Sequence, residues 1–279
     1  MQSTEGKKVL RKSRSFLRWA GSKKKLLPLL LQQMNFEYNK YIEPFVGSAQ
    51  LFFASRPESA VLGDSNESLI CCFKCVKDNP RKVYHHLKLF PLGKDFYYEL
   101  RASNDEKWSA EEKAAKFLYL NTFCFNGLYR TNKAGIFNVP YSDSSSKIID
   151  YEELLNVSLA LQSCDFVCAD FEKVVLEHCE PGDFIYLDPP YAVKNKDIFK
   201  QYGPHTFGLS DIERLKGLLN FIDSQGATFL LSYAYCDESI DLATAWNFKI
   251  IKTVRNISGF AKHRKQELEI LVSNKLINE

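Results

Sequence analysis

Hydrophobic residues fall into seven short apolar runs separated by amphipathic stretches. Short runs rich in β-branched and aromatic residues are typical of strands, and they occupy 41–45, 60–64, 164–169, 183–188, 227–232, 248–254 and 267–273. Helical periodicity covers 23–33, 66–78 and 210–224, where Ser210 and Glu213 fit a capping box. This alternation predicts an α/β fold with a mostly parallel sheet and helices on both faces.

The stretch 79–163 interrupts the alternation. It contains helical patterns at 80–90, 109–124 and 151–161 but no convincing strand. Aromatic, Asn, Arg and Lys side chains are frequent between 117 and 141, which a plain scaffold does not require. We therefore expect 79–163 to form an inserted, mostly helical domain, with 1–78 and 164–279 forming the α/β domain.

Charge is distributed unevenly along the 279 residues. The net charge is +3, yet nine Lys or Arg against Glu5 give +8 in the first 25 residues and leave −5 for the rest. Such a basic end suits nucleic-acid phosphates and equally a solvated tail. The apolar runs are shorter than the ~20 residues that span a bilayer, and the N-terminus lacks the apolar core of a secretory signal. We expect a cytoplasmic protein that does not enter a membrane.

The eight cysteines are expected to be free thiols, because nothing marks the chain as secreted. Cys72 and Cys75 have the spacing of zinc ligands. The other close pair, Cys164 and Cys168, lies in an alternating strand pattern instead of a tight turn. A buried structural role is therefore favoured over a metal site, and we expect no bound metal.

Two strand ends carry candidate ligand-binding residues. The segment YIEPFVGSAQ (41–50) reads as a strand, a turn at Gly47 and a helix that begins near Ser48, an arrangement that brings backbone close to a ligand. It lacks the three glycines of a dinucleotide fingerprint, so taken alone an ordinary tight turn is favoured. The next strand ends at Asp64, whose carboxylate can accept hydrogen bonds from ribose hydroxyls or cap the following helix.

The strand 183–188 ends in Asp188, Pro189, Pro190 and Tyr191. Prolines lack N–H donors and fix the chain, so the Pro189 carbonyl is left as an outward acceptor. Asp188 and this carbonyl can hold the two hydrogens of an amino group, while Tyr191 stacks on the ring that bears it. Such a pocket suits a base turned out of its helix. A plain strand-terminating turn is the alternative.

Six motifs occur in a fixed order along the chain. They are FLRWAGSK (16–23), EPFVGSA (43–49), GDSN (63–66), FNGLYR (125–130) with FNVP (137–140), ADF (169–171) and DPPY (188–191). Together they resemble the D12-class family of DNA adenine methylases, from about residue 16 to 273. The resemblance implies a class I methyltransferase fold, that is, a Rossmann-like seven-stranded mixed sheet with an inserted DNA-recognition domain. It also implies methyl transfer from S-adenosylmethionine to adenine N6.

The resemblance assigns roles to individual residues. The cofactor-binding set is Trp19, Ala20, Gly21, Lys23, Phe45, Gly47, Asp64, Asp170, Phe171 and Asp188, and the catalytic set is Asp188, Pro189, Pro190 and Tyr191. Since adenine N6 is a poor nucleophile, this chemistry needs alignment more than a base. The sulfonium carries its own leaving group, so no metal is required.

The segment 125–140 is expected to read DNA. The Arg130 guanidinium can pair with guanine, and Leu128 and Pro140 can contact a thymine methyl. The full DNA-binding set is Arg18, Phe125, Asn126, Leu128, Arg130, Asn132 and Pro140. In the family, the residue that matches Phe125 is aromatic and wedges into the space left by the flipped base. The residue that matches Arg18 is basic and contacts an outer guanine. These matches suggest a GATC-like target. Ser144 departs from the family, which often has an aromatic or basic contact there.

The expected partner is double-stranded DNA. We expect a monomer in solution, with a dimer on DNA as the alternative. Two other functions stay open from the sequence: a methyltransferase acting on RNA or a protein amide, and a DNA-binding regulator without catalysis. The 125–140 segment argues against the first, and the intact DPPY motif argues against the second. The sequence leaves open whether a companion restriction endonuclease exists.

Overall fold

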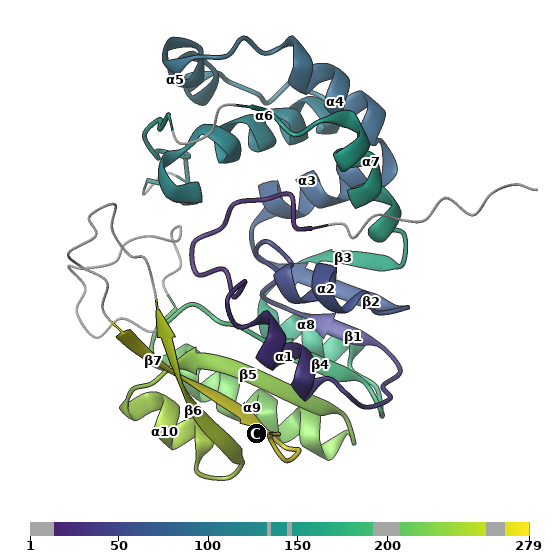
Figure 1. Ribbon diagram of the computed structural model, residues 1–279, viewed down its shortest axis with the longest axis vertical. Helices are drawn as coiled ribbons and strands as arrows, with labels where there is room; N and C mark the ends of the chain where they lie inside the picture. Colours follow the sequence, from purple (N-terminus) through teal and green to yellow (C-terminus); the bar gives the residue numbers. More distant parts are fainter. Residues whose placement is uncertain (1–13, 133–134, 144–146, 192–206, 255–265, 279) are drawn as a thin grey trace, which may run out of the picture.

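One mixed sheet of seven strands forms the scaffold of the protein (Figure 1). The structure is a computed structural model and describes residues 14–132, 135–143, 147–191, 207–254 and 266–278. The strands are β1 (Tyr41–Glu43), β2 (Ala60–Asp64), β3 (Cys164–Cys168), β4 (Phe184–Leu187), β5 (Thr228–Ala234), β6 (Asn247–Val254) and β7 (Gln266–Ser273). All seven predicted strands are confirmed, and with them the predicted α/β fold with a seven-stranded mixed sheet.

The strand order is β3-β2-β1-β4-β5-β7-β6, so the order reverses between β1 and β4. Strands β1 to β5 run parallel, and β7 lies antiparallel between β5 and β6. In open parallel sheets, ligands bind in the crevice that such a reversal leaves at the carboxyl ends of the strands. The predicted glycine turn follows β1 and the DPPY motif follows β4, so both lie at this point of the sheet.

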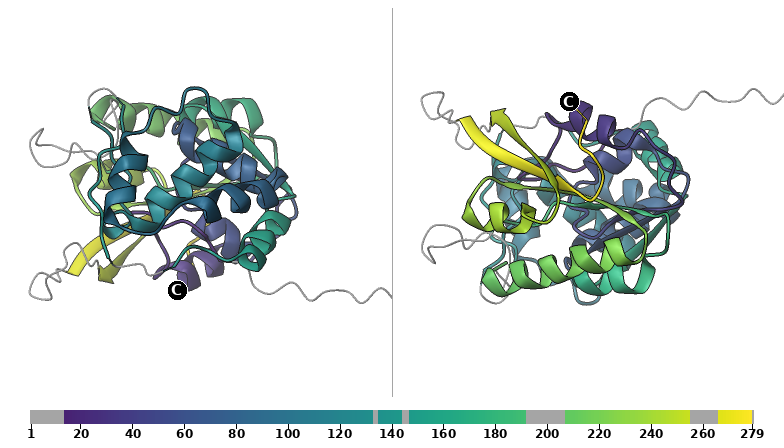
Figure 2. Two further views of the ribbon diagram at one scale, coloured as in Figure 1. Left: turned by 90° about the horizontal axis from the view of Figure 1, so that it is seen from above. Right: turned by 90° about the horizontal axis from the view of Figure 1, so that it is seen from below.

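The two faces of the sheet bury separate hydrophobic clusters. Neighbouring side chains on a strand point to opposite faces, and Ile185 and Tyr186 on β4 accordingly join different clusters. The face of Ile185 is covered by α8 (Phe171–His178), α9 (Leu209–Ser224) and α10 (Asp237–Ala243). The face of Tyr186 is covered by the N-terminal segment with α1 (Leu27–Gln33), α2 (Gln50–Ser55) and α3 (Glu67–Asp78) (Figure 2).

A helical lobe packs on α3 at one end of the sheet (Figure 1). It consists of α4 (Pro80–Leu89), α5 (Lys94–Ala102), α6 (Ala110–Phe123) and α7 (Tyr151–Ala160). A capping box starts α6, since Ser109 Oγ accepts the Glu112 N–H at 3.3 Å and the Glu112 carboxylate accepts the Ser109 N–H at 2.8 Å. The short helix η1 (Phe125–Gly127) follows α6. Within its described residues, the stretch 79–163 contains helices and no named strand.

Two predicted helix starts are wrong. Helix α9 begins at Leu209, and the Gly208 N–H donates to the Asp211 carboxylate at 2.9 Å, so Ser210 lies inside the helix and Glu213 makes no capping box. Helix α1 begins at Leu27 instead of residue 23, with its proline in the first turn, where a missing N–H costs nothing. Helices α5, α8 and α10 were not predicted.

Membrane-spanning and metal-binding features were sought in the same described ranges. Each helix there is too short or too polar to cross a bilayer. Across those residues, no three His, Cys, Asp or Glu side chains are grouped so that they could hold a metal ion. Cys72, Cys75 and Cys164 are buried free thiols, whereas Cys168 is exposed.

Candidate active site

Asp188 lies just after β4 in a network of polar groups. Its Oδ1 is 2.8 Å from Lys23 Nζ and accepts a hydrogen bond from Ser232 Oγ at 3.2 Å. The hydroxyls of Ser232 and Tyr186 are 3.0 Å apart, so the network continues onto β4. Both contacts of Asp188 fall on Oδ1. The orientation of the carboxylate is therefore set through one of its two oxygens.

Lys23 joins the first and last residues of the DPPY motif. Its ammonium donates to the Tyr191 hydroxyl at 3.1 Å and lies 5.3 Å from the centroid of that ring. The Tyr191 ring meets Tyr233 edge-on, with centroids 5.2 Å apart. Pro189 is buried and Pro190 is exposed. The N-terminal motif and the DPPY motif, 165 positions apart along the chain from Lys23 to Asp188, thus form one cluster.

The strand beside β4 contributes another buried carboxyl group. Glu43, the last residue of β1, is 3% exposed and accepts a hydrogen bond from the Tyr41 hydroxyl at 2.8 Å. Burial raises the pKa of Glu43 well above its ordinary value, against the effect of this hydrogen bond, and the charges of Asp188 and Asp64 raise it further. The strand ends around Asp188 are therefore a costly place for negative charge, which the ammonium of Lys23 offsets.

Gly47 forms a tight turn after β1. Its φ of +43° lies in the left-handed region, and a Cβ there would be 3.0 Å from the Trp19 indole. The Gly47 N–H donates to Asp64 Oδ2 at 3.2 Å, while Asp64 Oδ1 accepts the Asn66 N–H at 2.9 Å. Asn66 itself caps α3, so Asp64 does not. Desolvation raises the pKa of Asp64 to about 6.

Aromatic rings line the other side of this turn. Phe45 and Phe171 stack with centroids 5.0 Å apart and planes inclined by 24°, and Phe207 contacts both. The Arg214 guanidinium lies 4.7 Å from the Phe171 centroid and forms an ion pair with Asp170. Asp170 also caps α8 through Oδ1. Phe45, Phe171 and Asp170, all predicted to bind the cofactor, are thus brought together.

Trp19 lies between the glycine turn and the helical lobe. Its indole faces Gly47 and stacks on Tyr129, with centroids 5.6 Å apart. Ala20 and Gly21 follow in a turn, where Gly21 is exposed and has φ of +80°. The segment from Trp19 to Lys23 therefore crosses from the helical lobe to Asp188.

Arg18 is held against the end of α6. Its backbone N–H donates to Asn121 Oδ1 at 2.9 Å, and Asn121 Nδ2 donates to the Arg18 carbonyl at 2.7 Å. Its guanidinium donates to the Thr122 carbonyl at 2.9 Å. A Cβ at Gly127 would lie 2.5 Å from the Arg18 Cβ, so only glycine permits this approach. Arg18 therefore lies directly beside η1.

Phe125 and Asn126 are exposed on η1. The Phe125 side chain is 44% exposed, and its backbone N–H donates to the Pro140 carbonyl at 2.9 Å. Asn126 has φ of +54°, a conformation that this residue type tolerates better than most. Leu128 is half-buried and packs on the core. Of these predicted DNA contacts, Phe125, Asn126 and Pro140 are on the surface.

Arg130 and Asn132, two further predicted DNA contacts, form hydrogen bonds within the segment that follows η1. Arg130 Nε donates to Asn138 Oδ1 at 2.7 Å, so its guanidinium is turned along this segment. Asn132 Oδ1 accepts the Ile136 N–H at 3.0 Å and closes the turn. Ser144 lies outside the described residues.

The network around Asp188 includes residues that the sequence did not point to. Ser232 and Glu269 occupy inward positions of β5 and β7, and Glu269 Oε2 is 3.6 Å from Lys23 Nζ. Ser232 interrupts an otherwise apolar strand, which is a signal that could have identified it, whereas β7 begins with Gln, Glu, Leu and Glu and gives no such signal for Glu269. Tyr129 and Asn121 carry no such signal, because they act through contacts between segments distant in sequence.

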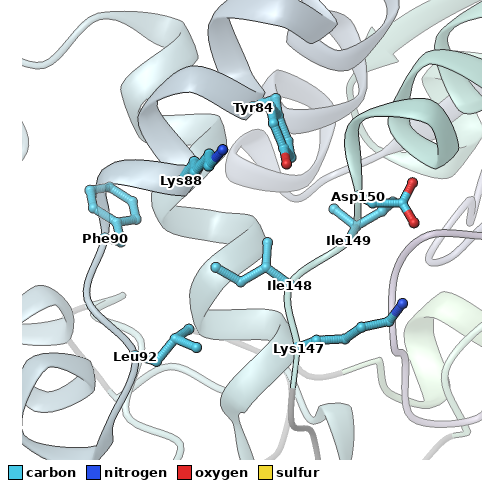
Figure 3. A pocket seen from close by; sticks show the side chains of 8 residues that line it. All are labelled: Tyr84, Lys88, Phe90, Leu92, Lys147, Ile148, Ile149 and Asp150. Carbon is cyan, nitrogen blue, oxygen red and sulfur yellow. The ribbon is translucent and has the colours of Figure 1, made fainter.

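A separate cavity of about 290 Å³ opens in the helical lobe (Figure 3). Its wall comes from α4, the segment that follows it and the approach to α7, and consists of Tyr84, Lys88, Phe90, Leu92, Lys147, Ile148, Ile149 and Asp150. None of these residues belongs to the polar network or to the glycine turn. The cavity is therefore distinct from the candidate active site.

Comparison with known proteins shows the family of this chain. The family model for D12 class N6 adenine-specific DNA methyltransferase matches residues 19–258. Type II methyltransferase M1.LlaDCHI of Lactococcus lactis subsp. cremoris is 35% identical over 94% of this chain and 95% of its own length. Type II methyltransferase M.MjaIII of Methanocaldococcus jannaschii is 35% identical over 93% of this chain and 98% of its own length. DNA adenine methylase of Haemophilus influenzae is 32% identical over 93% of each chain. The chain therefore belongs to the D12 class of N6 adenine-specific DNA methyltransferases and is a DNA adenine-N6 methyltransferase.

Proposed function

We propose that the protein transfers a methyl group from S-adenosylmethionine to N6 of an adenine that is flipped out of duplex DNA, within a GATC-like site. The observation that carries the proposal is the anchoring of Asp188 at the switch point of the sheet, where Lys23 and Ser232 both hold Oδ1. Because the chain is a DNA adenine methyltransferase, the RNA or protein methyltransferase and the regulator without catalysis are set aside.

The residues around the glycine turn fit S-adenosylmethionine. The missing Cβ at Gly47 lets the Trp19 indole lie against the turn, and Asp64 beside it offers carboxylate oxygens to ribose hydroxyls. The stacked rings of Phe45 and Phe171 offer an apolar surface to an adenine ring. We assign Asp170 to the amino group of that adenine, and Trp19, Ala20 and Gly21 to closing over the ligand. When bound, the cofactor supplies an electrophilic methyl group with a neutral thioether as leaving group.

The chain's own residues then hold the target amino group. Asp188 and the Pro189 carbonyl accept its two hydrogens, which favours a pyramidal nitrogen with its lone pair available. Pro190 fixes this conformation, since its ring restricts the backbone. Tyr191 stacks on the adenine, and its hydroxyl is held by Lys23 at 3.1 Å. Alignment of this kind can supply several kcal/mol of the barrier reduction.

DNA recognition falls to the surface beside η1. We assign Phe125 to the space that the flipped base leaves, because its ring is 44% exposed on a backbone fixed through Pro140. Arg18, Asn126 and Arg130 supply polar contacts to base edges and backbone. Leu128, Asn132 and Pro140 complete the DNA-binding set. The hydrogen bond from Arg130 to Asn138 holds that guanidinium in a defined orientation before DNA arrives.

The two lobes have different proposed roles. We propose that 79–163 is the target-recognition domain and that 1–78 with 164–279 is the catalytic domain. The clamp of Arg18 by Asn121 joins the two, so the N-terminal segment serves both. We propose that one chain binds one duplex site, as a monomer in solution.

Methyl transfer to defined duplexes tests the proposal. Protein is incubated with tritiated S-adenosylmethionine and duplexes that differ only in the four base pairs around one adenine, and nucleosides are identified by mass spectrometry. We expect N6-methyladenine at the GATC duplex, and at least tenfold less label at the others. Transfer at equal rates to all duplexes would overturn the GATC-like target, whereas cofactor binding without any transfer would overturn the active site.

The Asp188→Asn variant provides the matched control. It keeps the shape of the side chain but weakens its acceptor character, so we expect transfer to fall by at least about 100-fold, the range for removing one preorganised polar contact. Binding of the duplex should change less than about threefold.

A further inference from the structure

Glu269 is a buried carboxylate that none of the assigned roles uses. It lies on β7 opposite Ala234 of β5 and Ile251 of β6, and it is 3% exposed. Its Oε2 is 3.6 Å from Lys23 Nζ. A buried charge is costly unless it is paired, so its position next to Lys23 calls for a role.

Lys23 is shared between two carboxylates. Its Nζ lies 2.8 Å from Asp188 Oδ1 and 3.6 Å from Glu269 Oε2, and only 6% of its side chain is exposed. A lysine paired with Asp188 alone would neutralise that carboxylate fully. With Glu269 also present, the three groups carry a formal net charge of −1, and the ammonium is drawn toward both partners.

The charge of this cluster matters for the reaction. As the N6–carbon bond forms and the carbon–sulfur bond breaks, the sulfur keeps the bonding electron pair and N6 becomes positively charged until it loses a proton to water. Preorganised negative charge close to a developing positive charge lowers the barrier, most strongly where water is excluded. Asp188 can supply that charge only if Lys23 does not cancel it.

We propose that Glu269 is a positioning residue of the active site that acts through Lys23. By sharing the ammonium, it keeps Lys23 in place against Asp188 and Tyr191 and leaves a net negative charge at Asp188 for the adenine amino group. Glu269 does not touch the substrate in this scheme. The inference rests on the proposed role of Asp188 and extends it to β7.

The test compares Glu269→Gln with a matched control, Asp183→Asn. Asp183 is also a buried carboxylate beside a lysine, 3.4 Å from Lys40 Nζ, but it lies at the amino end of β4, away from Asp188. Single-turnover methylation is measured with DNA and S-adenosylmethionine at saturation, well below both melting temperatures. We expect Glu269→Gln to slow methyl transfer roughly 10- to 100-fold, by analogy with the outer partners that orient the ligands of a metal ion. KM for both substrates should stay within about threefold, and Asp183→Asn should keep the wild-type rate.

A conservative variant keeps the proposal open to refutation if Glu269→Gln does not fold. Glu269→Asp retains the charge on a shorter side chain, and we expect it to slow transfer less than tenfold with KM unchanged. Transfer by Glu269→Gln within twofold of wild type would overturn the proposal. So would equal losses in Glu269→Asp and Glu269→Gln, or an equal loss in Asp183→Asn, since each indicates a purely structural role. Full activity of Asp188→Asn would instead overturn the proposed role of Asp188.

Discussion

The indole ring of Trp19 stacks on the phenol ring of Tyr129, with centroids 5.6 Å apart and planes inclined by 17°. Trp19 belongs to the N-terminal motif, whereas Tyr129 belongs to the segment that we propose reads DNA. The indole also covers Gly47, where a Cβ would approach it to 3.0 Å. The ring pair therefore connects the segment that we propose reads DNA, the recognition segment, to the turn at Gly47, which we propose binds the cofactor and call the cofactor turn.

Loss of this ring contact is expected to weaken cofactor binding. Aromatic pairs contribute about 0.5–1.5 kcal/mol beyond their buried area, so Tyr129→Leu should raise the Kd for S-adenosylmethionine about 3- to 10-fold. Isothermal titration calorimetry measures the change. Tyr129→Phe keeps the ring and should stay within twofold of wild type. An unchanged Kd in Tyr129→Leu contradicts the link between recognition segment and cofactor turn.

Gly47→Ala should damage the cofactor turn by two routes. Its φ of +43° costs an alanine about 1–2 kcal/mol, and the new Cβ pushes on the Trp19 indole. We expect at least a tenfold weaker affinity for S-adenosylmethionine and a melting temperature lower by several degrees. Gly226→Ala is the control, because it has φ of +73° but nothing within 4 Å of a new Cβ. It should lower stability and leave cofactor affinity unchanged.

The sequence predicted the framework well, because the framework depends on local patterns. Apolar runs located all seven strands, and the residues that follow two of these strands located the turn at Gly47 and the DPPY motif. The predicted start of α9 was wrong because several polar side chains near it could cap the helix. The Gly208 N–H donates to the Asp211 carboxylate, and the predicted capping box of Ser210 and Glu213 does not form.

Most of the polar network around Asp188 could not be predicted from the sequence. Ser232 of β5 donates to Asp188 Oδ1 and Glu269 of β7 lies near Lys23, so both contacts depend on the strand order. The clamp between Arg18 and Asn121 likewise joins residues 103 positions apart. Such contacts follow from strand order and lobe packing, which hydrophobic periodicity does not encode.

Cofactor affinity should depend on pH through Asp64. Desolvation raises the pKa of Asp64 to about 6, so the carboxylate becomes protonated as pH falls through that value. A protonated carboxyl is a weaker acceptor for ribose hydroxyls, and the Kd for S-adenosylmethionine should rise between pH 7 and pH 5. The stability contribution has the opposite sign, because a raised carboxyl pKa favours folding at low pH and that contribution is lost as pH rises through about 6.

Asp64→Asn separates these two effects. The amide does not titrate, so the variant should bind the cofactor weakly at every pH, and the change in Kd between pH 7 and pH 5 should shrink. Thermal melting of the unliganded wild type and variant over the same pH range measures how Asp64 changes the stability of the fold. A wild-type Kd that stays constant from pH 7 to pH 5 contradicts the assignment of Asp64 to the cofactor.

Phe125→Ala should impair base flipping without affecting the cofactor. The Phe125 ring is 44% exposed, and its backbone is fixed by the Pro140 carbonyl and by the packing of Gly127 on Arg18. Stacking of an aromatic ring on a base contributes about 1–3 kcal/mol, so kcat/KM for duplex DNA should fall about 5- to 150-fold.

A duplex with 2-aminopurine at the target position reports flipping directly, since its fluorescence rises when the base leaves the stack. We expect a smaller rise with Phe125→Ala than with wild type, and an unchanged rise with Leu92→Ala, a change at a residue that is 60% exposed in the separate cavity. Equal fluorescence in all three proteins would assign the wedge to another side chain.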